Sequence, residues 1–180
     1  MSVTTKRGDD GKTDLLFGRR IEKASPLMAA MGLIDELNAA LGLVRVSGIA
    51  GARREQIDGI QEKLVGLMGE LATHPEDSEK YDEAGYPRVG DADVDHLEAA
   101  TRTLEADMDI RFKGWARPGK EACESAARLD YARTVCRRAE QGLWSTPSAR
   151  NAARLFLNRL SDLLWVMARA EALEAGQTES

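Results

Sequence analysis

The stretch ARTVCRRAE, residues 132–140, organises the fold that we expect for this chain. Arg133, Arg137 and Glu140 recur at i, i+4 and i+7, so they share one face of a helix, and Asp130 extends that face by one turn. The arginines can bind phosphate through permanently charged, rigid forks of donors, although a solvated, salt-bridged face is the simpler interpretation. The opposite face is apolar and can pack against other helices; it carries Leu129, Ala132, Cys136, Ala139 and Leu143.

The composition is that of one globular domain. The 180 residues are 43% hydrophobic and 31% charged, which is an ordinary balance for a folded protein. A net charge of −5 argues against a broad nucleic-acid surface, so any phosphate site must be local. No apolar run approaches the ~18 residues that span a bilayer, and the N-terminus lacks the apolar segment of a signal peptide. We therefore expect a soluble cytoplasmic protein that binds neither nucleic acid nor membrane, with two reduced thiols.

Apolar residues at helical spacing predict an all-α, five-helix bundle between residues 25 and 176. Residues 74–90 and 112–119 carry turn signals and are expected to be loops, as is the polar segment 1–24, and 177–180 is a tail. No strand pattern is recognisable. The expected helices begin after Ser25 and end near Val46, span about 53–73, begin at Asp91 or Asp93, span about 121–145, and run from Thr146-Pro147 to about Gly176.

The N-terminal segment contains Gly8-Asp-Asp-Gly-Lys-Thr13, which superficially resembles a phosphate-binding P-loop. The resemblance fails because a P-loop needs four residues between its glycines and a preceding strand, and neither is present. A glycine-rich loop with Lys6, Arg7, Lys12 and Thr13 can still wrap a nucleotide with backbone amides. A plain flexible N-terminus is the alternative.

Histidine is too scarce for most metal or nucleophilic chemistry. Ferritin-like bundles need Glu-x-x-His pairs, whereas the only histidines, His74 and His96, follow Leu71 and Asp93 at that spacing. Neither Ser–His nor Cys–His pairs are evident. We therefore expect no metal ligands from side chains, and surface positions for both histidines.

Three further polar or aromatic residues have two interpretations each. Asp35 lies along a partly apolar stripe and is either exposed or partnered at a helix or subunit contact. Asn158 interrupts a leucine-rich helix and either pairs with its polar neighbours or contacts a ligand. Trp115, in a loop before Pro118-Gly119, either plugs the end of the bundle or forms an apolar wall of a ligand cavity.

Four segments together resemble the ATP:cob(I)alamin adenosyltransferases of the PduO type, in the order and spacing of that family. The segments are residues 5–13, 32–42, 132–140 and 157–162. The resemblance implies a five-helix bundle that forms homotrimers with active sites between subunits. It also implies transfer of the 5′-deoxyadenosyl group of ATP to the cobalt of cob(I)alamin, with release of triphosphate. Co(I) is itself the nucleophile, so the protein has to position ATP, neutralise the leaving group and expose the cobalt.

The resemblance also implies roles for individual residues. Residues 1–24 would be a nucleotide-binding loop, and Mg²⁺ would be carried by ATP rather than by side chains. Asp35 and Arg133 would form an ion pair between subunits beside the corrinoid, and with Arg137 would be the catalytic residues. Trp115 falls where the family has a phenylalanine that excludes the lower axial base. The implied ATP contacts are Thr5, Lys6, Arg7, Gly8, Thr13, Asp14, Lys23, Arg137, Arg138, Glu140 and Asn158.

The departures from the family pattern concentrate near the corrinoid residues. Trp115 replaces phenylalanine, Asp130 a histidine, Lys120 a glycine and Gln141 an arginine, and the segment from Pro118 to Arg133 is about two residues longer. The alternative is therefore a non-catalytic carrier or sensor that binds ATP or an adenosylated corrinoid. For the enzyme, a cobalamin-dependent enzyme that receives the product is a possible partner.

Overall fold

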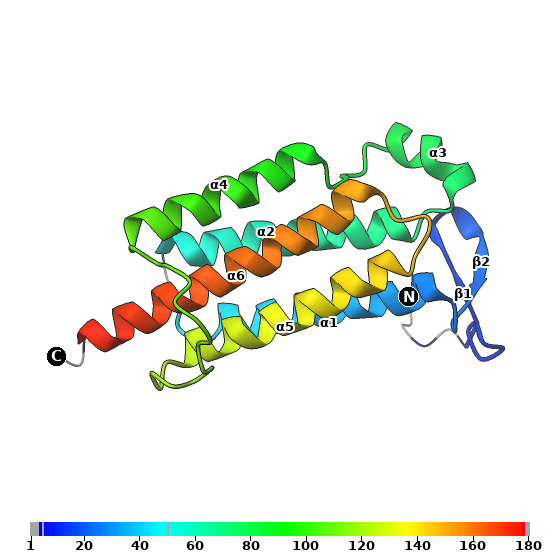
Figure 1. Ribbon diagram of the computed structural model, residues 1–180. Coiled ribbons are helices and arrows are strands. Elements are labelled where there is room, and N and C mark those ends of the chain that lie inside the picture. Colours follow the sequence, from blue (N-terminus) through cyan, green and yellow to red (C-terminus); the bar gives the residue numbers. More distant parts are fainter. Residues whose placement is uncertain (1–3, 5, 50, 179–180) are drawn as a thin grey trace.

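The structure is a computed structural model that describes residues 4, 6–49 and 51–178, and it confirms the all-α bundle. Figure 1 shows the long helices side by side, with a small hairpin at one end and the C-terminus at the other. The short α3, Ser78–Glu83, lies beside the hairpin. The long helices are α1 (Pro26–Arg45), α2 (Gly51–Leu71), α4 (Asp91–Asp107), α5 (Glu124–Trp144) and α6 (Asn151–Thr178).

The apolar stripes of the sequence form one core. The α5 residues predicted to face inward are all buried, and α5 packs against α1 and α6. Gly142 allows α1 close to α5, because a Cβ there would lie 2.9 Å from Leu33 Cδ1. The other fully buried positions of the stripes are Ile34, Leu37, Leu41, Val44, Ile57, Leu64, Leu67, Leu157, Leu160, Leu163, Leu164 and Met167.

The segment 1–24 contains a hairpin that the sequence did not reveal. β1 (Lys12–Asp14) pairs antiparallel with β2 (Arg20–Glu22), through a 3₁₀ turn at Leu16–Gly18. Strands of three residues are too short to show alternation, which explains why no pattern was visible. The Leu16 amide donates to the Ala72 carbonyl at 2.8 Å, so the hairpin docks on the end of α2.

The expected start of the last helix at Thr146-Pro147 is wrong, since α6 begins at Asn151. Thr146 is buried, and its hydroxyl donates to the Gly142 carbonyl at 3.0 Å. The amide of Ala149 donates to the Thr146 carbonyl at 3.1 Å. Residues 145–150 therefore form the turn from α5 to α6. The expected loop 74–90 also contains a 3₁₀ turn, Pro75–Asp77, and α3.

Helix α1 is the one helix in the described ranges that is long and apolar enough to cross a membrane. Its residues Ile34, Leu37 and Leu41 are, however, completely buried, and it packs against α2 and α5. These contacts make α1 a core helix of the bundle.

Candidate functional site

The outer side of α5 carries the arginines that the sequence analysis singled out. Arg137 and Arg138 are exposed, and Arg138 forms an ion pair with Glu36 of α1. Arg137 has no hydrogen bond or ion pair to any residue in the described part of the chain, so its guanidinium is available to a ligand. Behind it Cys136 is buried, donates to the Leu157 carbonyl at 3.2 Å, and has its thiol pKa raised by that burial.

A polar network continues from α5 to α6 and α4. The Asn158 amide donates to Glu140 Oε1 at 3.2 Å, and its oxygen accepts from Arg159. Arg159 in turn pairs with Glu98 of α4 at 2.7 Å and lowers the pKa of that carboxyl. Desolvation raises the pKa of the neighbouring Asp162. We call Arg137, Arg138, Glu140 and Asn158 the α5–α6 face; three of its four side chains are already held by neighbours. The expectation that Asn158 pairs with nearby polar groups is confirmed.

Asp130 does not extend the exposed face of α5, and that expectation is wrong. Its side chain is only 3% exposed, because it lies between α5 and α6 and forms an ion pair with Arg169. Its other oxygen is 3.4 Å from Nε of Arg133. Residue 130 lies close enough to the buried stripe of α5 that the packing of α6 covers it. One buried carboxylate thus holds two arginines.

Asp35 is exposed on α1, and within the described residues it has no ion pair or hydrogen bond. Within this chain Arg133 is 3.4 Å from Asp130, and its predicted pairing with Asp35 of another subunit stays a prediction. The neighbouring Asn38 accepts from Gln61 of α2 at 3.1 Å.

The N-terminal hairpin holds most of the predicted nucleotide residues. Arg7 pairs with Asp14 at 3.0 Å, and Lys23 Nζ donates to the Gly8 carbonyl at 2.7 Å. A Cβ at Gly8 would lie 2.6 Å from that ammonium, so a larger residue there would make the end of the Lys23 side chain shift. Lys6 and Thr13 lie in the same segment, with Lys6 at a positive φ of 57°. Thr5 lies outside the described residues.

Sequence reasoning missed two arginines that shape this hairpin. Arg20 donates to the Arg7 carbonyl at 2.6 Å and pairs with Asp10 at 3.0 Å. Arg19 pairs with Asp77, and so ties the hairpin to the 3₁₀ turn after α2. Two positive charges in a glycine-rich segment were the only sign in the sequence that these arginines matter. Their partners are identified only by the fold.

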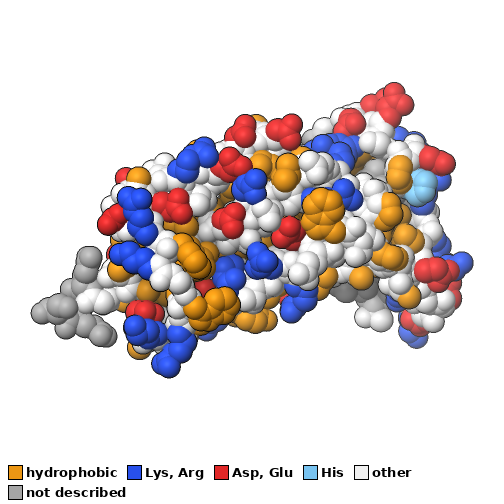
Figure 2. All heavy atoms as spheres, viewed as in Figure 1, with side chains coloured by type: hydrophobic (Ala, Val, Ile, Leu, Met, Phe, Trp, Pro, Cys, Tyr) orange, Lys and Arg blue, Asp and Glu red, His pale blue; other side chains and the backbone are white. Residues whose placement is uncertain are grey.

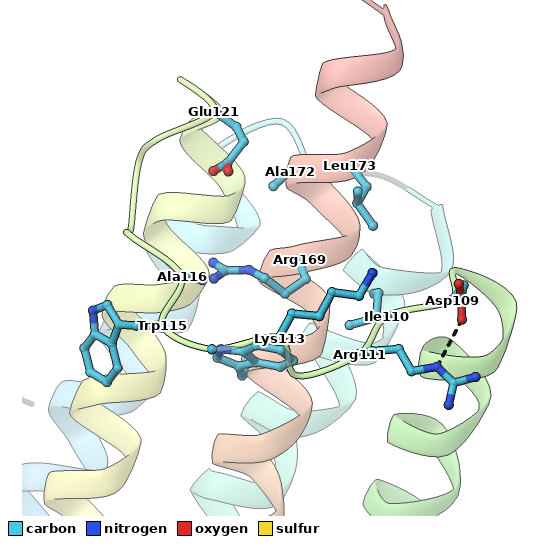
Figure 3. Close-up of a pocket in the computed structure, with 12 residues that line it drawn as sticks. Asp109, Ile110, Arg111, Lys113, Trp115, Ala116, Glu121, Arg169, Ala172 and Leu173 are labelled. Atoms are coloured by element: carbon cyan, nitrogen blue, oxygen red, sulfur yellow. Dashed lines mark hydrogen bonds and ion pairs between the residues drawn. The ribbon is translucent and has the colours of Figure 1, made fainter.

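The loop between α4 and α5, residues 108–123, forms the opposite end of the bundle and is called the end loop here (Figure 1). Trp115 is 92% exposed, so the interpretation as a plug is wrong. It contributes instead to the lining of a cavity of about 330 Å³ between the end loop and α6. Figure 3 shows Arg169 crossing this cavity from α6 toward Ala116. Sequence reasoning missed Arg169 and Trp165; their i, i+4 spacing in an apolar helix was the signal.

The predicted site residues therefore occupy three separate places in one chain. The hairpin lies at one end of the bundle and the end loop at the other, with the α5–α6 face on the helices that connect them (Figure 1). No hydrogen bond or ion pair among the described residues joins the hairpin to the α5–α6 face or to the end loop.

Comparison with a family model and comparison with individual proteins give the same family. A model of the cobalamin adenosyltransferase family matches residues 3–171. The corrinoid adenosyltransferase PduO of Salmonella typhimurium is 34% identical over 98% of this chain and 52% of its own length, so the chain spans about half of that relative. A corrinoid adenosyltransferase of Citrobacter freundii is 33% identical over 94% of both chains.

Solved structures resemble the whole fold. One is a variant PduO-type ATP:corrinoid adenosyltransferase from Lactobacillus reuteri complexed with cobalamin and ATP. It is 28% identical, with a TM-score of 0.80 over 98% of this chain and 96% of that chain. A second variant complexed with the same two ligands has a TM-score of 0.81.

Proposed function

This chain belongs to the cobalamin adenosyltransferase family, and on that premise we propose that it transfers the 5′-deoxyadenosyl group of ATP to the cobalt of cob(I)alamin. In this reaction the Co(I) electron pair attacks C5′ of ATP, the C5′–O bond breaks, and a Co–C bond forms. The bonding electrons leave with triphosphate, and cobalt is formally oxidised from Co(I) to Co(III). The protein needs no nucleophile or base of its own.

The observation that carries this proposal is the α5–α6 face. Arg137 has no partner among the described residues, while Glu140 and Asn158 beside it are already held in one hydrogen-bonded network. Such an arrangement suits a polyanionic leaving group, because a guanidinium without a competing carboxylate is available to bind the charge that develops on it. Arg137 and Arg138 would bind phosphates, and Glu140 and Asn158 would contact the rest of the nucleotide.

The hairpin would supply the other nucleotide contacts, through Thr5, Lys6, Arg7, Gly8, Thr13, Asp14 and Lys23. Within the described residues no group of three or more His, Cys, Asp or Glu side chains could hold a metal ion. In this proposal Mg²⁺ would be carried by the phosphates of ATP.

A complete site would need more than one subunit. No hydrogen bond or ion pair among the described residues joins the hairpin to the α5–α6 face, and Asp35 is exposed without such a partner in the same ranges. A homotrimer would account for both observations by bringing the hairpin of one subunit to α5 of the next. Asp35 would then pair with Arg133 of the neighbour, beside a corrinoid that rests against Trp115. The product would pass to a cobalamin-dependent enzyme in the cytoplasm.

A turnover assay tests the proposal directly. The purified chain is mixed with MgATP and chemically reduced cob(I)alamin, and the absorbance change of Co–C bond formation is followed. Repeated turnover with stoichiometric triphosphate release is expected. If no product forms while ATP still raises the melting temperature, the chain is instead a nucleotide-binding carrier or sensor, since only a ligand of the native state stabilises it.

A further inference from the structure

The cavity behind the end loop combines aromatic walls with cationic groups. Trp165 lies at its base, with its ring centroid 6.0 Å from that of Phe112 and 5.6 Å from the guanidinium carbon of Arg169. Lys113 and Arg169 supply positive charge, and Figure 3 shows the Lys113 side chain passing in front of α6 toward Ile110, while the Arg169 guanidinium points toward Ala116. Aromatic surface beside cations suits a flat heterocycle that carries an anionic group.

Two donors in this cavity are not committed to other groups. Nε of Arg169 is buried and has no hydrogen-bond partner among the described residues, while Asp130 binds another nitrogen of the same guanidinium. Lys113 likewise has no ion pair within the described ranges. A buried donor without an acceptor is unfavourable, which favours an occupant that supplies an acceptor oxygen.

The carboxylates that line the cavity restrict where an anion can bind. Asp109 is 3.1 Å from Nε of Arg111, so these two charges neutralise each other. Glu121 lies at the end of the cavity near Ala172, away from Lys113 (Figure 3). The lining cations that no lining carboxylate pairs with are therefore Lys113 and Arg169.

Trp115 lies on the other side of the same loop. Figure 3 shows its ring pointing away from Lys113 and Arg169, and Figure 2 shows hydrophobic side chains beside Lys and Arg at this end of the molecule. The end loop thus has an outer side with Trp115 and an inner side with the cations. A corrinoid against the outer side would have its displaced lower-ligand tail within reach of the inner side.

We propose that the cavity between the end loop and α6 binds the nucleotide tail of the corrinoid substrate, with Lys113 and Arg169 contacting its phosphate and Trp165 its base. This inference rests on the proposed function, and it makes Lys113 a specificity-determining residue. The tail consists of a phosphodiester, a ribose and a benzimidazole, and a cavity of about 330 Å³ is within the range of small-molecule sites. ATP is the less suitable occupant, since its proposed contacts lie on the hairpin and the α5–α6 face.

The test compares cobalamin with cobinamide, which lacks the phosphate, ribose and benzimidazole. Steady-state kinetics with saturating MgATP are measured for the parent chain and for Lys113→Gln, an exposed position whose change leaves the core intact. We expect KM for cob(I)alamin to rise about tenfold with kcat unchanged, and KM for cob(I)inamide to stay the same. The matched control is Lys120→Gln, on the same loop but outside the cavity lining, which should change neither value.

Equal changes of KM for both corrinoids, or no change for either, would overturn the tail site while leaving the transfer reaction established. If neither corrinoid is adenosylated, the proposed function fails and the cavity is tested by binding alone. The probe is then the free dimethylbenzimidazole ribotide, titrated against tryptophan fluorescence. Saturable quenching that is about tenfold weaker in Lys113→Gln supports the site, and absence of saturable quenching overturns it.

Discussion

The α5–α6 face and the end loop both present cations to solvent, but they hold them in different ways. On the α5–α6 face the polar groups lie on two long helices. The Asn158 amide nitrogen is 3.2 Å from Glu140 Oε1, and Arg159 and Glu98 continue this network. The end loop has no regular structure, and Asp109, Gly114, Gly119 and Ala122 in it have positive φ. Within the loop Asp109 and Arg111 pair with each other, whereas the adjacent Arg169 belongs to α6 and pairs with Asp130 of α5. The comparison teaches that Arg138, Glu140 and Asn158 are held by neighbouring helices, whereas Lys113 of the end loop has no ion pair among the described residues.

Removing the carboxylate under the end loop should have the largest effect. Asp130→Ala leaves Arg169 and Arg133 without their buried partner and should lower the free energy of unfolding by about 3 kcal/mol. Urea denaturation measures the change. The matched control, Asp58→Ala, breaks the half-exposed pair with Arg45 and should cost less than about 1 kcal/mol. Equal losses would mean that α6 does not anchor the end loop through this pair.

Arg137→Ala should remove the main phosphate contact of the α5–α6 face. Because the side chain is exposed, stability should not change, while kcat/KM falls about 100-fold, equivalent to about 2.7 kcal/mol. The adenosylation assay with cob(I)alamin measures this loss. Arg54→Ala, an exposed arginine of α2, serves as the control and should keep full activity. Wild-type kinetics in Arg137→Ala would remove the α5–α6 face from the reaction.

Asp35→Ala tests whether the corrinoid and ATP are bound by different residues. If Asp35 pairs with Arg133 of a neighbouring subunit beside the corrinoid, its loss should raise KM for cob(I)alamin about tenfold and leave KM for ATP unchanged. Both constants come from the same assay with one substrate varied at a time. Asp95→Ala, an exposed carboxylate of α4, is the control. A parallel rise in both constants would show that the site does not divide into nucleotide and corrinoid parts.

The smallest effect concerns the docking of the hairpin at low pH. Arg19, followed by Lys80, holds the pKa of Asp77 at about 2, below its usual 3.8. A depressed carboxyl pKa contributes stability that is present above about pH 4 and is lost as the pH falls toward 2. Asp77→Asn should therefore flatten the dependence of unfolding on pH between 4 and 2, with Asp95→Asn as control. An unchanged slope would mean that Asp77 does not hold the hairpin at neutral pH.

Helix periodicity made most of the fold predictable, because burial of one stripe requires only neighbouring residues on the same helix. All the inward positions expected on α5 are buried, and the bounds of the long helices lie within a few residues of expectation. The start of α6 was the exception. Thr146-Pro147 has the local pattern of a helix start, but the buried Thr146 hydroxyl binds the end of α5 instead.

The candidate site was less predictable than the fold. The resemblance to known adenosyltransferases selected positions, yet the residues that hold them were invisible in sequence. Glu36 binds Arg138 from 102 positions away, and Arg169 binds Asp130 from 39 positions away. Such pairs depend on how helices are placed side by side, and many placements would satisfy the same apolar stripes.

By itself, the sequence determined an all-α chain, the inward face of each helix and an arginine-bearing outer face on α5, because these follow from local spacing and charge. The tertiary structure alone decided that Asp130 lies buried against Arg169, that Trp115 is exposed, and that a cavity opens behind it. The physical reason is that burial of a polar side chain depends on which neighbouring helix covers it, and helix spacing does not encode that neighbour.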